Sequence, residues 1–371
     1  MKKMKKIGLI VLLAALICLP VFTGCKGKPG RVKLQYLMNE AKTEYSVRHR
    51  LGIYANGVVE LPSEHKKNLF DKKKPVTKIE SSGFRGATNF VAVTIPESIV
   101  EIGNHAFNRC YSLTVILKSS VPPKIYGQSF GDGTPLERMV KYIIVPADAV
   151  ETYKDEWKSI ESTNSKGETE YNTRLPGIIH SMDEVVDGKF LITDNGEDGK
   201  KLISYFGGEA SVSIPDGVTA TGTEAFIHND LIHEVTIHKN LIIGGLTAES
   251  FGAFDGCRFI SKITVAEDNP NYSVKDGVLY DKDKTAIFLV PQALKADVTI
   301  PDTVVKIAAR SFLERKKLTS VTIPATVKNI EADSFHDCSS KMTIKALCTE
   351  ENKPAGWAEG WNSGLTVEWN G

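Results

Sequence analysis

The chain has 371 residues, with 46 lysines and arginines against 45 aspartates and glutamates. This length suits two ordinary domains or one long array of repeats, and 42% apolar residues is typical of a folded core. Without the four lysines among residues 1–6, the net charge becomes −3. Binding of nucleic acid would need a basic face, so the charge gives no reason to expect that function.

The first 25 residues predict export and a lipid anchor. Four lysines precede an apolar run from Ile7 to Leu19, which is too short to span a membrane and suits the core of a signal peptide. Thr23 and Gly24 stand directly before Cys25 and resemble the bacterial lipobox. The resemblance implies cleavage before Cys25 and diacylglycerol on its sulfur. Such chains would tether the protein to a membrane, since each buried CH2 contributes about 0.8 kcal/mol.

The lipobox match departs from the usual motif at Phe22, where Leu is preferred, and ordinary secretion with a free Cys25 is the alternative. Lys26-Gly27-Lys28 follows the cysteine, in the place of the acidic residues often found in lipoproteins sent to the outer face. We therefore expect a lipid-anchored protein of the cell envelope, at the outer membrane or cell surface. The sequence leaves open whether it faces the exterior or the periplasm.

A repeat follows, with the pattern Phe-x2-Cys-x2-Leu-x2-Val-x-Ile and, in several copies, a closing Pro. A period of 20–29 residues with regularly spaced leucine-like positions is typical of a leucine-rich-repeat solenoid. The intervals 84–107 and 312–335 in the phenylalanine column are 23 residues each. The column reads Phe84, Phe107, Phe226, Phe254, Phe312 and Phe335.

The Val-x-Ile pair of each copy predicts a short strand with both side chains on one face. Stacked coils would join these strands into a parallel sheet, with the phenylalanines filling the interior behind it. The cysteines of the repeat share one column and are expected to be small buried residues, not disulfides or ligands: Cys110, Cys257 and Cys338. The residue between Val and Ile points outward, and five such threonines form the candidate binding face: Thr94, Thr236, Thr264, Thr299 and Thr322.

Two β-hairpins are expected to interrupt the second half, one around Asp194-Asn195-Gly196 and one around Asp281-Lys282-Asp283-Lys284. The pattern is lost over polar residues 161–186, which predicts a boundary there. The predicted divisions are a signal peptide at 1–24, a lipidated tether and N-terminal cap at 25–75, a first repeat array at 76–160, a linker at 161–186, and a second array with a C-terminal cap at 187–371.

The Ala-Phe-x2-Cys segment and the Val-Thr-Ile-Pro strand resemble the BspA-type leucine-rich repeats of bacterial surface proteins. The tryptophan-bearing ends, Tyr153 with Trp157 and the run from Trp357 to Trp361, look like that family's array-ending segments. The resemblance implies a mostly β chain with short helical segments, a right-handed solenoid with a parallel sheet on one face, hairpin insertions and caps. It implies no catalytic residues, and some members adhere to host matrix proteins or other cells.

Residues with other possible roles have simpler explanations. His228, His233 and His238 recur every five residues, which is not the i, i+4 spacing of metal-binding helices, so no metal is expected. The acidic hairpin turns do not complete a calcium loop, and phosphate-cradle and nucleophile-elbow motifs are absent, so no cofactor is expected. The tryptophans could stack on sugars, but they lie in the proposed caps and more simply cover the solenoid ends.

These observations favour a non-enzymatic, lipid-anchored envelope protein that presents a repeat surface to an unidentified protein or glycan. Its expected partners are the membrane, through Cys25, and that ligand; nucleic acid is not expected, and the oligomeric state is open. Two alternatives stay open: a passive or accessory envelope component of a nutrient-uptake system, and an enzyme. A deep pocket with several perturbed carboxylates or histidines would favour the enzyme.

Overall fold

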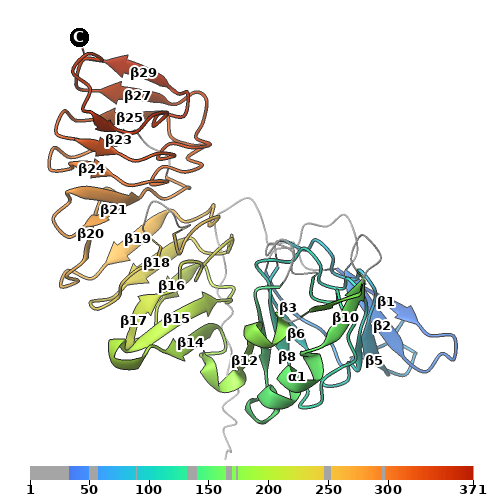
Figure 1. The fold of residues 1–371 in the computed structure, drawn as a ribbon. Helices are drawn as coiled ribbons and strands as arrows, with labels where there is room; N and C mark the ends of the chain where they lie inside the picture. Colours follow the sequence, from blue (N-terminus) through green and yellow to red (C-terminus); the bar gives the residue numbers. More distant parts are fainter. Residues whose placement is uncertain are drawn as a thin grey trace, which may run out of the picture.

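The computed structural model describes residues 33–49, 57–88, 90–131, 140–163, 169–172, 174–245, 252–294 and 297–370. They form two stacks of short β coils, and we call residues 33–181 the first array and residues 182–370 the second array. The first array lies beside the N-terminal part of the second and does not continue its axis (Figure 1). The predicted fold class, a mostly β solenoid with parallel sheets, is confirmed.

The first array has a five-stranded sheet in which every neighbouring pair is parallel, because each coil contributes one short strand running in the same direction. Its strands, in spatial order, are β12 (Ile179–Ser181), β9 (Tyr142–Val145), β8 (Thr114–Leu117), β6 (Phe90–Ile95) and β3 (Gly57–Glu60).

A second ladder of shorter strands runs along another side of the same coils. It is parallel from β2 through β5 to β7, and β1 closes it on one side as an antiparallel strand. The strands β2 and β3, which lie in the region predicted as a cap, thus add one strand to each ladder. The strands are β1 (Leu34–Met38), β2 (Tyr45–His49), β4 (Glu64–His65), β5 (Lys74–Ile79) and β7 (Glu101–Ile102).

The far end of the first array is closed by the one α-helix among the described residues, α1 (Val150–Trp157). Trp157 is 2% exposed and packs on Phe130, with ring centroids 5.4 Å apart, so it covers the end of the core as predicted. The helix follows η2 (Ala147–Ala149) and precedes the hairpin of β10 (Ile160–Thr163) and β11 (Thr169–Asn172).

The predicted linker at 161–186 is built into both arrays and is not a free connection. After η3 (Leu175–Ile178), β12 pairs in parallel with β9 and becomes the last strand of the first sheet. After three intervening residues, β13 (Val185–Val186) pairs with β14 (Phe190–Asp194) of the second array. The turn between them, η4 (Met182–Glu184), begins at Ser181, which forms a reciprocal capping box with Glu184. The polar composition reflects turns and a short edge strand.

The second array begins with the first predicted hairpin, β14 (Phe190–Asp194) and β15 (Lys200–Tyr205), joined around η5 (Gly196–Asp198). β15 then pairs in parallel with β17 (Val218–Thr221), which starts a short-strand ladder. The long-strand sheet here is parallel throughout and consists of β16 (Ser211–Ser213), β18 (Glu234–Ile237) and β19 (Lys262–Val265).

The second hairpin insertion also forms as predicted, and it separates the second array into two cores. Beyond it both ladders resume. The hairpin strands are β20 (Tyr272–Lys275), β21 (Val278–Asp281) and β22 (Ala286–Leu289). The short ladder continues through β24 (Lys306–Ile307), β26 (Asn329–Ile330) and β28 (Gly356–Trp357), and the long one through β23 (Val298–Thr299), β25 (Ser320–Ile323), β27 (Thr343–Ala346) and β29 (Thr366–Trp369).

The phenylalanine column is the interior, as predicted. Its six members are at most 6% exposed, and successive rings stack at 4.6–5.3 Å in the three pairs 84–107, 226–254 and 312–335. Phe130 extends the column by one coil that the pattern did not identify. Trp361 packs on Phe335 at the C-terminal end, so this tryptophan also covers an open core.

The cysteine column is buried and serves the coil-to-coil contact. Each thiol donates a hydrogen bond to the main-chain carbonyl of the phenylalanine one coil earlier. The donor–acceptor distances are 3.1 Å from Cys110 to Phe84, 2.8 Å from Cys257 to Phe226 and 2.8 Å from Cys338 to Phe312. Burial raises the pKa of the Cys110 thiol to about 12 and raises that of the other two. These thiols are therefore poor nucleophiles.

Two positions differ from the sequence pattern by one residue. Ile116 was expected inside, but Val115 and Leu117 fill the core and Ile116 points outward. In the last full coil Met342 is buried, while Lys341, which the pattern placed in that column, is exposed. In the first case the strand itself is shifted by one residue, since Val115 and not Ile116 pairs with Val93, and alternation along the strand then buries Val115 and Leu117. In the second case β27 keeps the 23-residue step, and the shift lies in the turn before it.

The outward side of the first long-strand sheet is covered by the second array. Ala92 and Ile144 have no exposed surface, and they pack in one apolar cluster with Leu191 and Phe206 of the second array. Ile116 lies at the border of this cluster. The hairpin β14–β15 stands next to β12 and β8 in Figure 1, consistent with this contact. The two arrays are thus docked through an apolar interface.

No helix among the described residues has the length and apolar character needed to cross a membrane.

Candidate functional site

Four of the five predicted threonines lie on the outward side of the second array's long strands. Thr236 pairs in register with Thr264, and Thr299 with Thr322. The first three are exposed and Thr322 is half-buried. They form two short polar rows, one on each side of the hairpin insertion.

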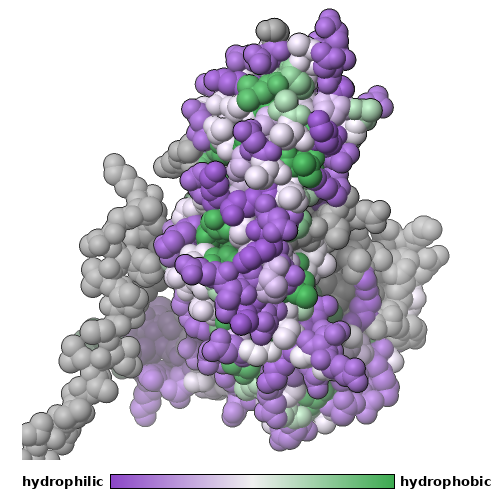
Figure 2. Space-filling model, turned by 90° about the vertical axis from the view of Figure 1, so that its left-hand side faces the viewer, coloured by the Kyte–Doolittle hydropathy of each residue, from purple (hydrophilic) through white to green (hydrophobic). Residues whose placement is uncertain are grey.

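Polar side chains extend these rows. Ser213 precedes Thr236 in register, and Lys345 and Glu368 follow Thr322. From the side shown in Figure 2, the second array carries mostly hydrophilic side chains, and its hydrophobic ones appear as separate spots. The strand rows can therefore offer hydroxyl and charged groups to a ligand.

Thr94 belongs to a different environment from the other four. It lies in β6, in register with Ile116, next to the cluster that joins the two arrays. Its side chain is half-buried. Because the sheet face around it is occupied by the second array, Thr94 is not part of one continuous threonine surface with the others.

A groove with a volume of about 1080 Å³ lies between the arrays. One wall comes from the first array and includes Tyr111, Lys141, Tyr142 and Arg174. The other comes from the second array, from the two residues that follow each phenylalanine of the column. We call these residues the turn ridge; they are Ile227, His228, Asp255, Gly256, Leu313, Glu314, His336 and Asp337.

The repeat creates the turn ridge by forcing a tight turn after each buried phenylalanine. The second residue of each turn has a positive φ: 53° at His228, 68° at Gly256, 59° at Glu314 and 54° at Asp337. At Gly256 a Cβ would lie 2.1 Å from the His228 ring, so the glycine leaves room for that ring. The flanking polar side chains are left pointing away from the core, toward the first array.

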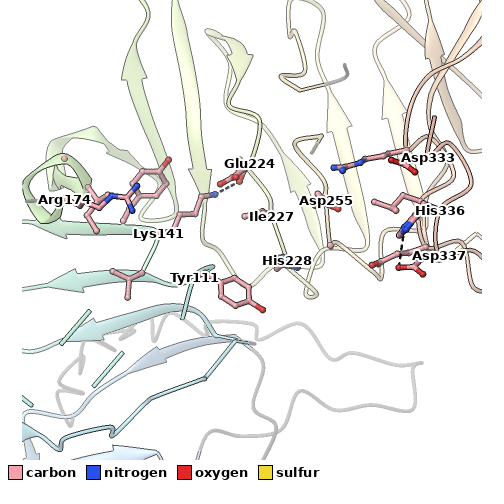
Figure 3. A pocket seen from close by; sticks show the side chains of 18 residues that line it. Tyr111, Lys141, Arg174, Glu224, Ile227, His228, Asp255, Asp333, His336 and Asp337 are labelled. Atoms are coloured by element: carbon pink, nitrogen blue, oxygen red, sulfur yellow. Dashed lines mark hydrogen bonds and ion pairs between the residues drawn. The ribbon is translucent and has the colours of Figure 1, made fainter. Parts of the chain in front are cut away.

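Lys141 crosses the groove and ties the arrays together. Its ammonium donates a hydrogen bond to the main-chain carbonyl of Glu224 (Figure 3) and lies 5.5 Å from the centroid of the Tyr142 ring. Desolvation in the groove lowers the pKa of Lys141 to about 8, against the opposing charge of Glu224. The same desolvation raises the pKa of Tyr142 to about 12.

Tyr111 and His228 form the second contact across the groove. Their rings meet edge to face with centroids 5.7 Å apart, and Figure 3 shows the two residues close to each other. Behind them lies Asp255, whose pKa is raised by burial and also by Glu314, while His228 opposes the rise. The groove is thus lined by both signs of charge together with partly exposed aromatic rings.

A second hollow of about 610 Å³ shares Tyr111, His228, Gly256 and Glu314 with the first, so the groove continues past them. Here Arg258 makes an ion pair with Asp230, and its Nε donates a 3.1 Å hydrogen bond to the same carboxylate. Phe259 is 44% exposed, and Lys317 lies 5.8 Å from its ring centroid. The extension adds guanidinium, ammonium and aromatic groups.

The groove's titratable groups do not form a catalytic arrangement among the described residues. Lys141 is engaged with a carbonyl, and the nearest acid–base contact, His336 Nδ1 to Asp337 Oδ2 at 3.5 Å, lies on the exposed rim. Within the same ranges, no group of three or more histidine, cysteine, aspartate or glutamate side chains could hold a metal ion.

The sequence pattern predicted the threonine rows but missed the groove. Its signal was present in the second position after each phenylalanine, which is polar or glycine in the four copies of the second array: His228, Gly256, Glu314 and Asp337. The other predicted functional residue, Cys25, lies outside the described residues.

Stacked coils with a buried phenylalanine column, parallel ladders and an open polar surface define a solenoid repeat protein. The model of the BspA type leucine-rich repeat region matches this chain in six copies, over residues 66–143, 206–295 and 293–350. The chain therefore belongs to the BspA-type leucine-rich-repeat family.

Several solved structures are similar to the chain. A leucine-rich cell surface protein from Faecalibacterium prausnitzii is 16% identical over 93% of this chain and 96% of that one, with a TM-score of 0.29. A leucine-rich-repeat protein from Eubacterium ventriosum is 17% identical over 91% and 76%, with a TM-score of 0.36. One from Bacteroides ovatus is 16% identical over 91% and 98%, with a TM-score of 0.31. No curated protein matches the chain.

Proposed function

We propose that this chain is a non-enzymatic, lipid-anchored envelope protein that binds a polar protein or glycan segment on its leucine-rich-repeat surface. The observation that carries the proposal is the inter-array groove, with its volume of about 1080 Å³ and its continuation of about 610 Å³. Single small-molecule pockets are usually about 300–1000 Å³, so an extended ligand is the better fit. Both walls come from hydrogen-bonded coils, so the protein needs little further ordering of its own when a ligand binds.

The side chains of the groove support a polar, extended ligand. Tyr111 and Phe259 offer exposed ring faces, and Arg258 offers a guanidinium held by Asp230. Tyrosine and arginine are enriched among the residues that dominate binding energy at protein interfaces. Aromatic faces next to charged hydrogen-bonding groups can also hold a sugar ring. Acidic and basic groups are mixed along the groove, which does not favour a uniformly charged polymer.

The strand face of the second array is a secondary surface in this proposal. Thr236, Thr264, Thr299 and Thr322 would extend the contact of a large ligand by hydrogen bonding. Being small and lacking an apolar neighbour of their own, they are expected to tune specificity more than affinity.

The site is best tested by a binding screen followed by two matched double variants. A chain from Lys26 to Gly371 would be screened against proteins and glycans, and any ligand found would be titrated against both variants. Tyr111→Ser/Arg258→Glu alters the groove at exposed side chains and is expected to weaken binding roughly tenfold or more, as for interface hot spots. Thr236→Lys/Thr264→Lys is the control on the strand face and is expected to change affinity less than about threefold.

The reverse order of effects would move the binding site to the strand face. Equal affinity in both variants would exclude both surfaces. A screen in which no protein or glycan binds would overturn the binding proposal in favour of a passive envelope component.

The anchor is a separate part of the proposal and rests on the leader sequence. The F. prausnitzii protein is described as a cell surface protein, which supports an envelope location for this chain. Cells expressing the wild type with a labelled fatty acid are expected to incorporate label into the protein, and Cys25→Ala is expected to abolish it. Continued labelling of Cys25→Ala would rule out the anchor at this residue without affecting the groove.

A further inference from the structure

The loop between β4 and β5 presents an apolar tip to solvent. Leu69 is 83% exposed and Phe70 is 97% exposed, the highest value for a large apolar side chain among the described residues. Neither residue contributes to any of the four apolar clusters. Two adjacent side chains that are this exposed bury almost no apolar surface in the folded protein. Contiguous exposed apolar groups mark sites of interaction.

The tip has a defined conformation on a fixed base. The side-chain oxygen of Asn68 accepts hydrogen bonds from the backbone N–H groups of Phe70, at 2.9 Å, and Asp71, at 3.1 Å. At the base, β4 pairs with β5, and His65 stacks on Tyr36 with ring centroids 3.6 Å apart. The loop is therefore held out from the first array with its two apolar side chains foremost.

Positive charge surrounds this tip. Residues 64–74 contain five lysines and two acidic residues, a net charge of +3 in eleven residues of a chain whose total is +1. Lys73 pairs with Glu64 at 3.4 Å, and this pair is exposed to solvent. Lys74 donates to the carbonyl of Lys42, which brings a further lysine to the base of the loop. The five lysines are Lys66, Lys67, Lys72, Lys73 and Lys74.

We propose that loop 66–73 is a membrane-docking loop that inserts Leu69 and Phe70 into the interface of an anionic lipid surface, while its lysines contact the headgroup phosphates. Apolar side chains backed by a ring of lysines are the arrangement that interfacial binding requires. Basic residues near an anionic membrane add electrostatic attraction that falls off within about a Debye length. A small convex tip suits a fluid surface, which closes around it, better than it suits a folded partner, which would need a matching pocket.

This inference does not depend on the groove ligand or on Cys25. The loop belongs to the first array, at the opposite end of its ladders from β12, whereas the groove lies against the second array. Docking by the loop would orient the first array on the membrane, a task that a flexible acyl tether alone does not perform.

Binding to phospholipid vesicles tests the proposal with the unlipidated chain from Lys26 to Gly371, which retains every residue that the structure describes. Vesicles that contain phosphatidylglycerol are expected to sediment the protein, and phosphatidylcholine vesicles or high salt are expected to reduce this strongly. Leu69→Ser/Phe70→Ser and, separately, Lys72→Glu/Lys73→Glu should each weaken binding roughly tenfold or more, because each removes one of the two contributions.

Two controls match these changes elsewhere on the surface. Val121→Ser removes a side chain that is 73% exposed, and Lys316→Glu/Lys317→Glu makes the same charge change in the groove. Both should leave vesicle binding and the melting temperature unchanged. A Phe70→Trp variant should show a blue-shifted emission that is quenched by brominated lipid only with anionic vesicles.

Three results would overturn the proposal: no sedimentation of the wild type with anionic vesicles, equal losses in the loop variants and the controls, or a Phe70→Trp emission that vesicles do not change. If the wild type bound an acidic protein but no lipid vesicle, and the loop variants lost that protein binding, the loop would be assigned to a protein partner instead. None of these results alters the expectation for the groove.

Discussion

The outward side of the long strands is apolar in the first array and polar in the second, although both arrays are built from the same coil. In the first array Ala92 and Ile144 are buried against the second array. In the second array the equivalent strand positions are occupied by Thr236, Thr264 and Lys345, which are exposed. The interior columns are the same in both. The difference shows that one outward column decides whether a sheet face becomes an internal joint or an open surface.

The first prediction tests the shared interior. Phe312→Ala in the second array and Phe107→Ala in the first should each lower the free energy of unfolding by about 3–5 kcal/mol, as for a buried phenylalanine truncated in a packed core. Denaturant unfolding measures this. A loss below about 1 kcal/mol in either array would mean that the phenylalanine column of that array is not part of a packed core. The two arrays would then differ in their interiors as well as in their outward faces.

The second prediction tests the outward faces directly. Ile144→Asp places a charge in the apolar joint and should cost about 2–4 kcal/mol or separate the arrays, whereas Thr322→Asp on the open face should change stability by less than about 0.5 kcal/mol. Thermal unfolding gives the stabilities, and small-angle scattering shows separation as an increased radius of gyration. Similar effects of the two substitutions would contradict the distinction between joint and surface.

A third prediction concerns Arg315, which takes the cysteine position of the repeat in one coil of the second array. It is 2% exposed, its guanidinium donates to the carbonyls of Leu313 and Ser311, and no carboxylate in the described part pairs with it. Burial lowers its pKa to about 10. It lines a small cavity of about 50 Å³ next to Phe254.

Arg315→Met should therefore raise the free energy of unfolding by about 1 kcal/mol, because replacement of a buried ionic group by an apolar one of similar size is often stabilising. Denaturant unfolding at neutral pH checks this, with Lys316→Met on the surface as the control. A clear destabilisation would mean that the hydrogen bonds from the guanidinium to the two carbonyls stabilise the fold by more than burial of its charge costs.

The fourth and smallest effect is the pH dependence of the joint. Lys141 has a pKa of about 8 in the folded protein and an ordinary value of 10.5, so between these values the unfolded chain binds more protons. Stability should thus rise with pH through this window, and the rise should be absent in Lys141→Met. The raised pKa of Tyr142 acts in the opposite direction above about pH 10, so the difference between the two unfolding curves is the quantity to compare. Parallel curves would contradict the desolvation of Lys141.

The sequence was sufficient for the interior because every coil must bury the same positions to stack on its neighbours. The phenylalanine and cysteine columns, both hairpins and the tryptophan-covered ends followed from that requirement. It failed locally at Ile116, where the strand shifts by one residue, and at Lys341, where the turn before β27 shifts by one residue, because a pattern cannot say which of two neighbouring side chains faces inward. The linker was misjudged because β12 and β13 are two or three residues long and leave little hydrophobic periodicity.

The groove was beyond the pattern for a different reason. Tyr111 and His228 are 117 positions apart in the sequence, and their meeting depends on the angle at which the arrays dock. That angle is set by Ala92, Ile144, Leu191 and Phe206, residues that look like ordinary apolar strand positions. The repeat columns specify how each coil packs on the next coil, but they do not specify how one array packs on the other. The prediction of a single threonine face failed at Thr94 for the same cause.

The even step of the coils has a consequence for how such a protein can change. Thr299 and Thr322, and Lys306 and Asn329, are matched in register at a separation of 23 residues. Loss or gain of one such unit would move the chain by a single strand spacing of about 4.8 Å and leave every remaining pairing intact. The length of the second array can thus be changed by duplication of coils while the joint between the arrays and the lysine-rich loop 66–73 stay where they are.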